Sequence, residues 1–181
     1  MIGRPRLAEL PAMLALRALT VATPPPGLER PVPPPIRVEL HTALPALSRL
    51  EVAGPVAALG ALPPGLVELE LELAPGFEVT DPGVVPGLTS LSLRSSGWGR
   101  TADMPDHDLG FLRRFPNLRR LRLAGSGWRT LAALASCPGL ALVDLHMVTP
   151  ATDVSYLLAH PEIELRIPAM QREELGLPPA T

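Results

Sequence analysis

Asp144 and His146 are the residues of this chain whose types and spacing best suit acid–base chemistry. They lie two positions apart in a predicted strand, so both side chains lie on the same, outward face of that strand. A carboxylate that orients an imidazole is typical of a general base, and Ser92 or Thr149 would be the nucleophile. The sequence has no glycine-rich phosphate loop, CxxC pair or HExxH pattern. We therefore expect no enzyme and assign no catalytic residue, and keep a hydrolytic enzyme built on the Asp144–His146 edge as an alternative.

Residue types that bind metals gather at Asp103, Asp106, His107 and Asp108. No second His or Cys lies at ligand spacing, and the alternating acids of a calcium loop are absent. We therefore expect no metal and no other cofactor. Asp106 or Asp108 is instead expected to cap a short helix over residues 109–114.

Charged and polar residues recur at alternate positions of several short apolar segments. Because side chains alternate across a strand, each segment would present three of them on one face. The predicted outward triplets are Arg49, Glu51, Ala53; Glu68, Glu70, Glu72; Ser90, Ser92, Arg94; Arg120, Arg122, Ala124; and Leu142, Asp144, His146. An acidic column is thus followed by a small polar column and then by an arginine column, which Arg119, Arg113 and Arg114 would extend.

The segments that carry these triplets share one phrase. Residues 88–98 and 118–128 both read L-x-x-L-x-L-x-x-S-x-W. Related copies begin at Leu16, Leu47, Leu66 and Leu140, with a shorter one at Ile163, and the spacings from Leu66 to Leu88 and from Leu118 to Leu140 are both 22 residues. The phrase resembles the leucine-rich repeat, L-x-x-L-x-L-x-x-N/C-x-L, and its length resembles the short internalin-type bacterial class.

The resemblance implies an α/β solenoid, a curved coil with a parallel sheet on its concave face. Short helices, 3-10 turns or loops would form the convex face. Trp98 and Trp128 are expected in the core. Prolines lie two residues before five of the repeat starts, where each is expected to end the rear segment and set an extended approach to the strand: Pro45, Pro86, Pro116, Pro138 and Pro161.

We expect one domain over residues 1–181. Residues 1–46 would form an amino-terminal cap and a first irregular coil with a proline-rich loop, and residues 47–168 the repeats. Residues 169–181 would form the carboxyl-terminal cap, with a helix that turns Met170 and Leu175 inward.

The composition limits the class of partner that the chain is expected to bind. The net charge is −2, which gives no bulk attraction to nucleic acid or membrane. The single cysteine, Cys137, excludes an internal disulfide framework and is expected to be a buried filler. No signal peptide or membrane span is evident, so we expect a cytoplasmic protein.

These features together predict a non-catalytic protein–protein recognition module, an adaptor or subunit that binds a partner protein on its concave sheet. The expected contacts are Glu68, Glu70, Glu72, Ser92, Arg94, Arg120, Arg122, Asp144 and His146. An immunity or antitoxin-type inhibitor of an enzyme is an alternative. The loop at residues 99–110, the proline-rich segment and self-association through the amino-terminal end also stay open as binding modes. If the sheet binds no partner, its Glu and Arg side chains would only neutralise one another and keep the surface soluble.

Overall fold

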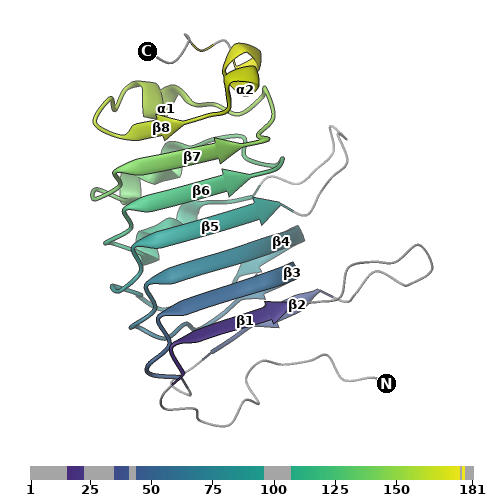
Figure 1. Cartoon of the computed structure of the whole chain (residues 1–181), viewed down its shortest axis with the longest axis vertical. Helices are drawn as coiled ribbons and strands as arrows, with labels where there is room; N and C mark the ends of the chain where they lie inside the picture. Colours follow the sequence, from purple (N-terminus) through teal and green to yellow (C-terminus); the bar gives the residue numbers. More distant parts are fainter. Residues whose placement is uncertain (1–15, 23–34, 41–43, 96–106, 176, 178–181) are drawn as a thin grey trace, which may run out of the picture.

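The computed structural model describes residues 16–22, 35–40, 44–95, 107–175 and 177. These residues form an eight-stranded parallel sheet of order β1-β3-β4-β5-β6-β7-β8, with β2 paired to β3 off this path (Figure 1). The strands are β1 (Ala18–Ala22), β2 (Ile36–Val38), β3 (Arg49–Leu59), β4 (Glu68–Val79), β5 (Ser90–Ser95), β6 (Arg120–Ala124), β7 (Leu142–His146) and β8 (Glu164–Arg166). The predicted parallel sheet with few short helices is confirmed.

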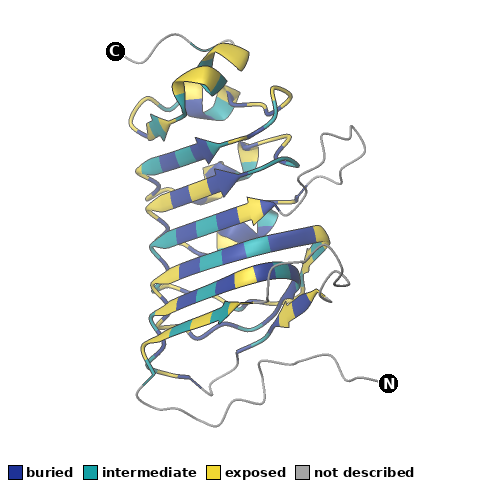
Figure 2. Cartoon of the chain, turned by 45° about the vertical axis from the view of Figure 1, so that its right-hand side comes forward, coloured by how far each residue is buried: buried dark blue, intermediate teal, exposed yellow. Residues whose placement is uncertain are grey.

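The apolar positions of the shared phrase lie next to one another across the sheet. Successive register partners from β3 to β8 are Leu50, Leu69, Leu91, Leu121, Val143 and Leu165. A second row joins Val52, Leu71, Leu93, Leu123 and Leu145. All of these except Leu165 are buried, and they alternate with exposed or half-buried residues along each strand (Figure 2). Each strand therefore has one face in the core and one face outside it.

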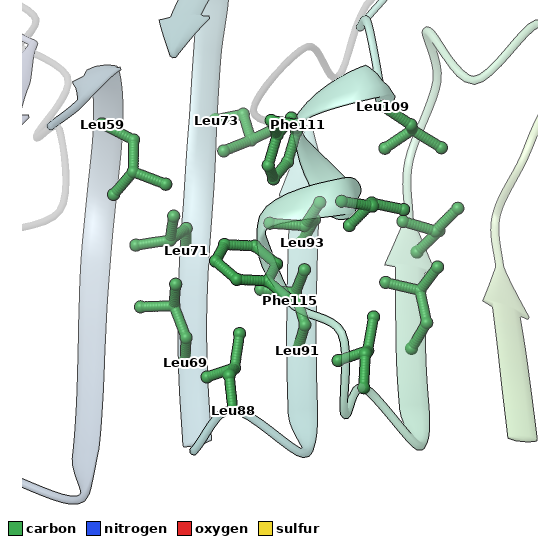
Figure 3. Packing of buried hydrophobic residues seen from close by; sticks show 14 of the residues in the cluster. Leu59, Leu69, Leu71, Leu73, Leu88, Leu91, Leu93, Leu109, Phe111 and Phe115 are labelled. Carbon is green, nitrogen blue, oxygen red and sulfur yellow. The ribbon is translucent and has the colours of Figure 1, made fainter. Parts of the chain in front are cut away.

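The 3-10 helices η2 (Gly110–Arg114) and η3 (Ala132–Ser136) and the α-helix α1 (Ser155–Leu158) lie behind the sheet, and the α-helix α2 (Ala169–Glu174) lies beyond β8 at its end (Figure 1). Phe111 and Phe115 of the η2 region pack against the inward leucines of β4 and β5 (Figure 3). Asp108 Oδ1 accepts a hydrogen bond of 2.7 Å from Gly110 N–H. Asp108 thus binds the first residue of η2 from the turn before it, but the N-cap position is Leu109 and no side chain caps the helix there, so the predicted cap does not form at Asp108. Asp106 lies outside the described residues.

A proline turn precedes six of the strands. In each turn an N–H bonds the carbonyl oxygen three residues earlier, and proline occupies the second position: Leu47 to Leu44, Leu66 to Pro63, Leu88 to Val85, Leu118 to Phe115, Leu140 to Cys137, and Ile163 to His160. Proline suits that position because its φ is already near the value a β-turn needs. The prolines therefore end the rear segments as predicted, but they form tight turns instead of an extended approach. Pro64, which the sequence analysis did not identify, has the same role.

The strands β3 and β4 extend beyond the short strands that the repeated phrase predicts. β3 has 11 residues and β4 has 12. The register between them shifts at Val52/Pro55, next to Gly54, and their distal halves pair again beyond the shift. Such an irregularity bends a strand, because one side contributes extra residues. The distal half of β3 then pairs with β2 as well.

The carboxyl-terminal helix forms, but one of its predicted inward residues does not face the core. Met170 is 80% exposed, so that prediction is wrong, while Leu175 packs against the core as expected. Gln171 joins α2 to the segment that follows β7. Its Oε1 accepts a 2.6 Å hydrogen bond from Met147 N–H, and its Nε2 donates a 3.2 Å bond to Val148 O.

Several predicted features lie outside the described residues. These are Trp98, the apolar amino-terminal segment before Leu16, the proline-rich stretch at residues 23–34, and residues 99–106 of the inserted loop.

Candidate protein-binding surface

The residues predicted to contact a partner share one face of the sheet, here called the open face. It consists of the outward side chains of β3 to β7: Arg49, Glu51, Glu68, Glu70, Glu72, Ser90, Ser92, Arg94, Arg120, Arg122, Leu142, Asp144 and His146. In Figure 1 the strands lie in front of the rear helical turns, and α2 lies beyond β8 at the end of the sheet. No helix of the described chain crosses the open face, so its side chains are free to meet another molecule.

Strand register arranges these side chains in three rows. The first row runs Arg49, Glu68, Ser90, Arg120, Leu142. The second runs Glu51, Glu70, Ser92, Arg122, Asp144, and the third runs Glu72, Arg94, Ala124, His146. All nine predicted contact residues are therefore brought together. Ala124, predicted outward, is only 9% exposed and adds little surface.

Ion pairs cross the open face between neighbouring strands. Arg49 Nη1 lies 3.4 Å from Glu68 Oε2, Arg94 Nη2 lies 3.4 Å from Glu70 Oε1, and Arg122 Nε lies 3.6 Å from Asp144 Oδ2. Their side chains are between 34% and 57% exposed, and such pairs contribute about 0–1 kcal/mol each. The predicted separation into an acidic and a basic column is thus partly cancelled.

Three charges remain without an ion pair to any described residue: Glu51, Glu72 and Arg120. Glu51 is the register partner of Glu70, so two carboxylates face each other across adjacent strands. Like charges in that position are unfavourable. Two unpaired acids on one side and an unpaired arginine on the other give the open face a residual charge asymmetry.

The arginine column is shorter than the sequence suggested. Arg113 and Arg114 belong to η2, which lies behind the sheet. Arg114 Nη2 lies 3.8 Å from Asp81 Oδ1 there. These two arginines therefore do not extend the open face, because the chain has passed to the rear layer before it reaches β6.

The open face has only shallow relief. One depression of about 60 Å³ is lined by Arg49, Glu68, Glu70, Ser90 and Ser92 among others, and one of about 70 Å³ by Glu51, Glu70, Glu72 and Arg94 among others. A water molecule occupies about 30 Å³ of liquid, so each depression suits a few waters or the tip of one side chain. A flat charged surface of this kind suits a protein partner better than an enclosed small molecule.

The candidate acid–base pair is not assembled in the structure. Asp144 contacts Arg122, and among the described residues no hydrogen bond joins it to His146. His146 is the register partner of Ala124, and Ser92 lies two strands away from β7. Asp144 is thus oriented by an arginine instead of orienting an imidazole.

Cys137 is buried, as predicted. Burial raises the pKa of its thiol, and a hydrogen bond with the Ser136 hydroxyl partly opposes that effect. Since the reactive form of cysteine is the thiolate, a raised pKa leaves this thiol less reactive at neutral pH.

His107 has a structural position that the sequence did not reveal. It is 8% exposed, its ring centroid lies 4.8 Å from that of Trp128, and its Nε2 lies 3.3 Å from Ser95 Oγ. Trp128 is 1% exposed and donates a 3.3 Å hydrogen bond to Ala124 O, so its predicted core location is confirmed. No local pattern relates His107 to Ser95, because the inserted loop separates them. Among the described residues no group of three or more His, Cys, Asp or Glu side chains is placed to hold a metal.

A scan against protein-family models finds no match, and neither the curated proteins nor the solved structures include one that matches this chain. No helix in the described ranges is long and apolar enough to cross a membrane.

Proposed function

We propose that this chain is a leucine-rich-repeat protein that binds a second protein on its open face, as a non-catalytic recognition module. The repeat interpretation rests on features that recur from one copy of the phrase to the next. Besides the six proline turns, five carbonyl oxygens each accept two N–H groups from the start of the next segment: those of Arg17, Ser48, Val67, Thr89 and Arg119. Recurrent turns, recurrent hydrogen bonds and leucines in register are what stacked repeats require.

The observation that carries the binding proposal is the open face itself. It presents charged and hydroxyl side chains from β3 to β7 in register, with shallow relief and no helix of the described chain across it. The exposed pairs there contribute little stability, so folding does not explain why charges occupy so many outward positions. Charged surfaces of this kind serve specificity and association rate in protein complexes.

The uncompensated charges indicate how a partner would be oriented. Basic side chains of the partner would lie over Glu51 and Glu72, and acidic side chains would lie over Arg120. A partner with that charge order would gain the ion pairs that the isolated chain lacks, while the reversed order would place like charges together.

The test is affinity capture from the native host with a charge-reversed variant. Glu70→Arg/Arg122→Glu keeps the net charge and alters only the open face. Arg113→Glu/Glu173→Arg is the matched control, because it makes the same two reversals at exposed residues of η2 and α2. We expect wild type and control to capture a stoichiometric partner that the open-face variant loses, with unchanged unfolding midpoints.

A partner captured equally by all three proteins would place the binding site elsewhere and overturn the proposal. If the captured partner is an enzyme whose activity the chain blocks, the recognition module is an inhibitor of the immunity or antitoxin kind.

A further inference from the structure

Ser90, Ser92, Arg120 and Arg122 form a compact group on the open face, here called the serine–arginine quartet. Ser90 is the register partner of Arg120, and Ser92 is the register partner of Arg122. Register partners on adjacent strands lie about 4.8 Å apart, and residues two apart along a strand lie about 6.6 Å apart. The backbone positions of the quartet therefore form a rectangle of about 4.8 by 6.6 Å, from which two hydroxyls and two guanidinium groups extend on the same face.

The hydrogen-bonding capacity of the quartet is largely unused. Neither serine hydroxyl bonds another residue that the structure describes, and Arg120 makes no ion pair with one. Arg122 Nε lies 3.6 Å from Asp144 Oδ2, which is long for a charge-assisted hydrogen bond. Two like charges side by side on β6 with unused donors indicate a site whose counter-ion comes from outside the chain.

The charges around the quartet select the ligand. Arg120, Arg122 and Asp144 sum to one positive charge, which a single carboxylate would neutralise. A phosphate dianion would exceed that charge, and Glu68 and Glu70 adjoin the two serines in the register of β4 and β5. The same glutamates disfavour the continuous phosphate backbone of a nucleic acid.

We propose that the serine–arginine quartet binds one Asp or Glu carboxylate of the protein partner. The two guanidinium groups donate to the carboxylate oxygens, and the Ser90 and Ser92 hydroxyls donate from the neighbouring strand. The inference rests on the proposed function, because it assigns a specific contact within the open face to the partner. It also adds Ser90, which the sequence analysis placed outward but did not include among the contacts.

The experiment is an NMR titration of the arginine Nε–Hε signals of the whole chain with acetate, at constant ionic strength maintained with chloride. We expect the Arg120 and Arg122 signals to shift with one common dissociation constant. The dissociation constant at Arg120 and Arg122 should be roughly two- to tenfold lower than at exposed Arg113, the range that one net hydrogen bond gives. Ser90→Ala/Ser92→Ala should raise it by a similar factor, with the Arg113 response unchanged.

A response at Arg120 and Arg122 no tighter than at Arg113 would overturn the proposal. A parallel titration with inorganic phosphate tests the choice of ligand. If the preference for phosphate over acetate is about tenfold greater at the quartet than at Arg113, the ligand is a phosphoryl group and the carboxylate assignment is wrong.

The titration needs no partner, so its failure is distinguishable from failure of the proposed function. If the quartet binds acetate but the partner ignores open-face reversals, the quartet is a carboxylate site, and both the proposed function and the assignment of that carboxylate to the partner are overturned. A partner lost on open-face reversal, together with a quartet that shows no preference for acetate, would overturn only the present inference.

Discussion

Replacing Leu121 by alanine tests the register on which every argument about the open face depends. Leu121 is 0% exposed and lies between its register partners Leu91 and Val143, which are also buried. Because β6 is hydrogen-bonded on both sides, the strand has little freedom to close the cavity. Leu→Ala substitutions in cores cost about 2–5 kcal/mol, and we expect about 3–4 kcal/mol here. Arg120→Ala, one residue away, should change the free energy of unfolding by less than about 0.5 kcal/mol, because Arg120 is exposed and has no ion pair with a described residue.

Urea unfolding followed by tryptophan fluorescence measures both variants, since Trp128 is 1% exposed in the folded chain. The difference between them, about 3 kcal/mol, corresponds to roughly a hundredfold in the unfolding constant. A one-residue slip in β6 would move every side chain to the opposite face. Equal destabilisation by Leu121→Ala and Arg120→Ala, or a larger effect of Arg120→Ala, would refute the register and with it the composition of the open face.

Three further predictions concern the carboxyl-terminal region. Thr152 is 4% exposed and its Oγ1 has no hydrogen-bond partner among the described residues, so Thr152→Val should raise the free energy of unfolding by about 1 kcal/mol in the same urea assay. A loss of stability would mean that the hydroxyl is bonded. Gln171→Ala removes the hydrogen bonds to Met147 N–H and Val148 O. It should speed amide hydrogen exchange in α2 with little effect in β5. Unchanged exchange in α2 would show that other contacts hold this helix. Hydrogen bonds from the Ser155 hydroxyl and then its backbone N–H lower the pKa of Asp153 from its usual 3.8, so this interaction is present above that pH and is lost as the pH falls through the lower folded-state pKa. A carboxylate NMR titration should show that lowered midpoint, which Ser155→Ala should raise, and an unchanged midpoint in the variant would contradict the assignment to the hydroxyl.

The strands and the direction of their side chains were predictable because they depend on local patterns. The alternation of apolar and polar residues in Glu68–Glu72 and Arg120–Ala124 determines which side chains face the core. The shared phrase located β3 to β8, and the size and hydrophobicity of Trp128 and Cys137 predicted their burial. The extra length of β3 and β4 was not predictable from the phrase, because the bend next to Gly54 lets strand pairing resume beyond it.

The pairing of charges could not be predicted from the sequence, because it depends on distances between strands and on side-chain torsions. Arg94 bonds Glu70 instead of its register partner Glu72, and Arg122 Nε lies 3.6 Å from Asp144 Oδ2. Sequence spacing does not predict either ion pair, because long side chains reach diagonal neighbours as well as direct ones. His107 likewise reaches Ser95 and Trp128 only because the chain returns to the same edge of the sheet after the inserted loop.

The sequence by itself determined where β3 to β8 lie along the chain and which of the side chains in the repeated phrase point outward, because both follow from local patterns of apolar and polar residues. Only the tertiary structure decided that Arg113 and Arg114 lie behind the sheet, that most open-face charges are paired, and that Arg120 is left beside two unused hydroxyls. Those outcomes depend on how the turns and rear segments set neighbouring strands in register, and register is a relation between segments that no single segment encodes.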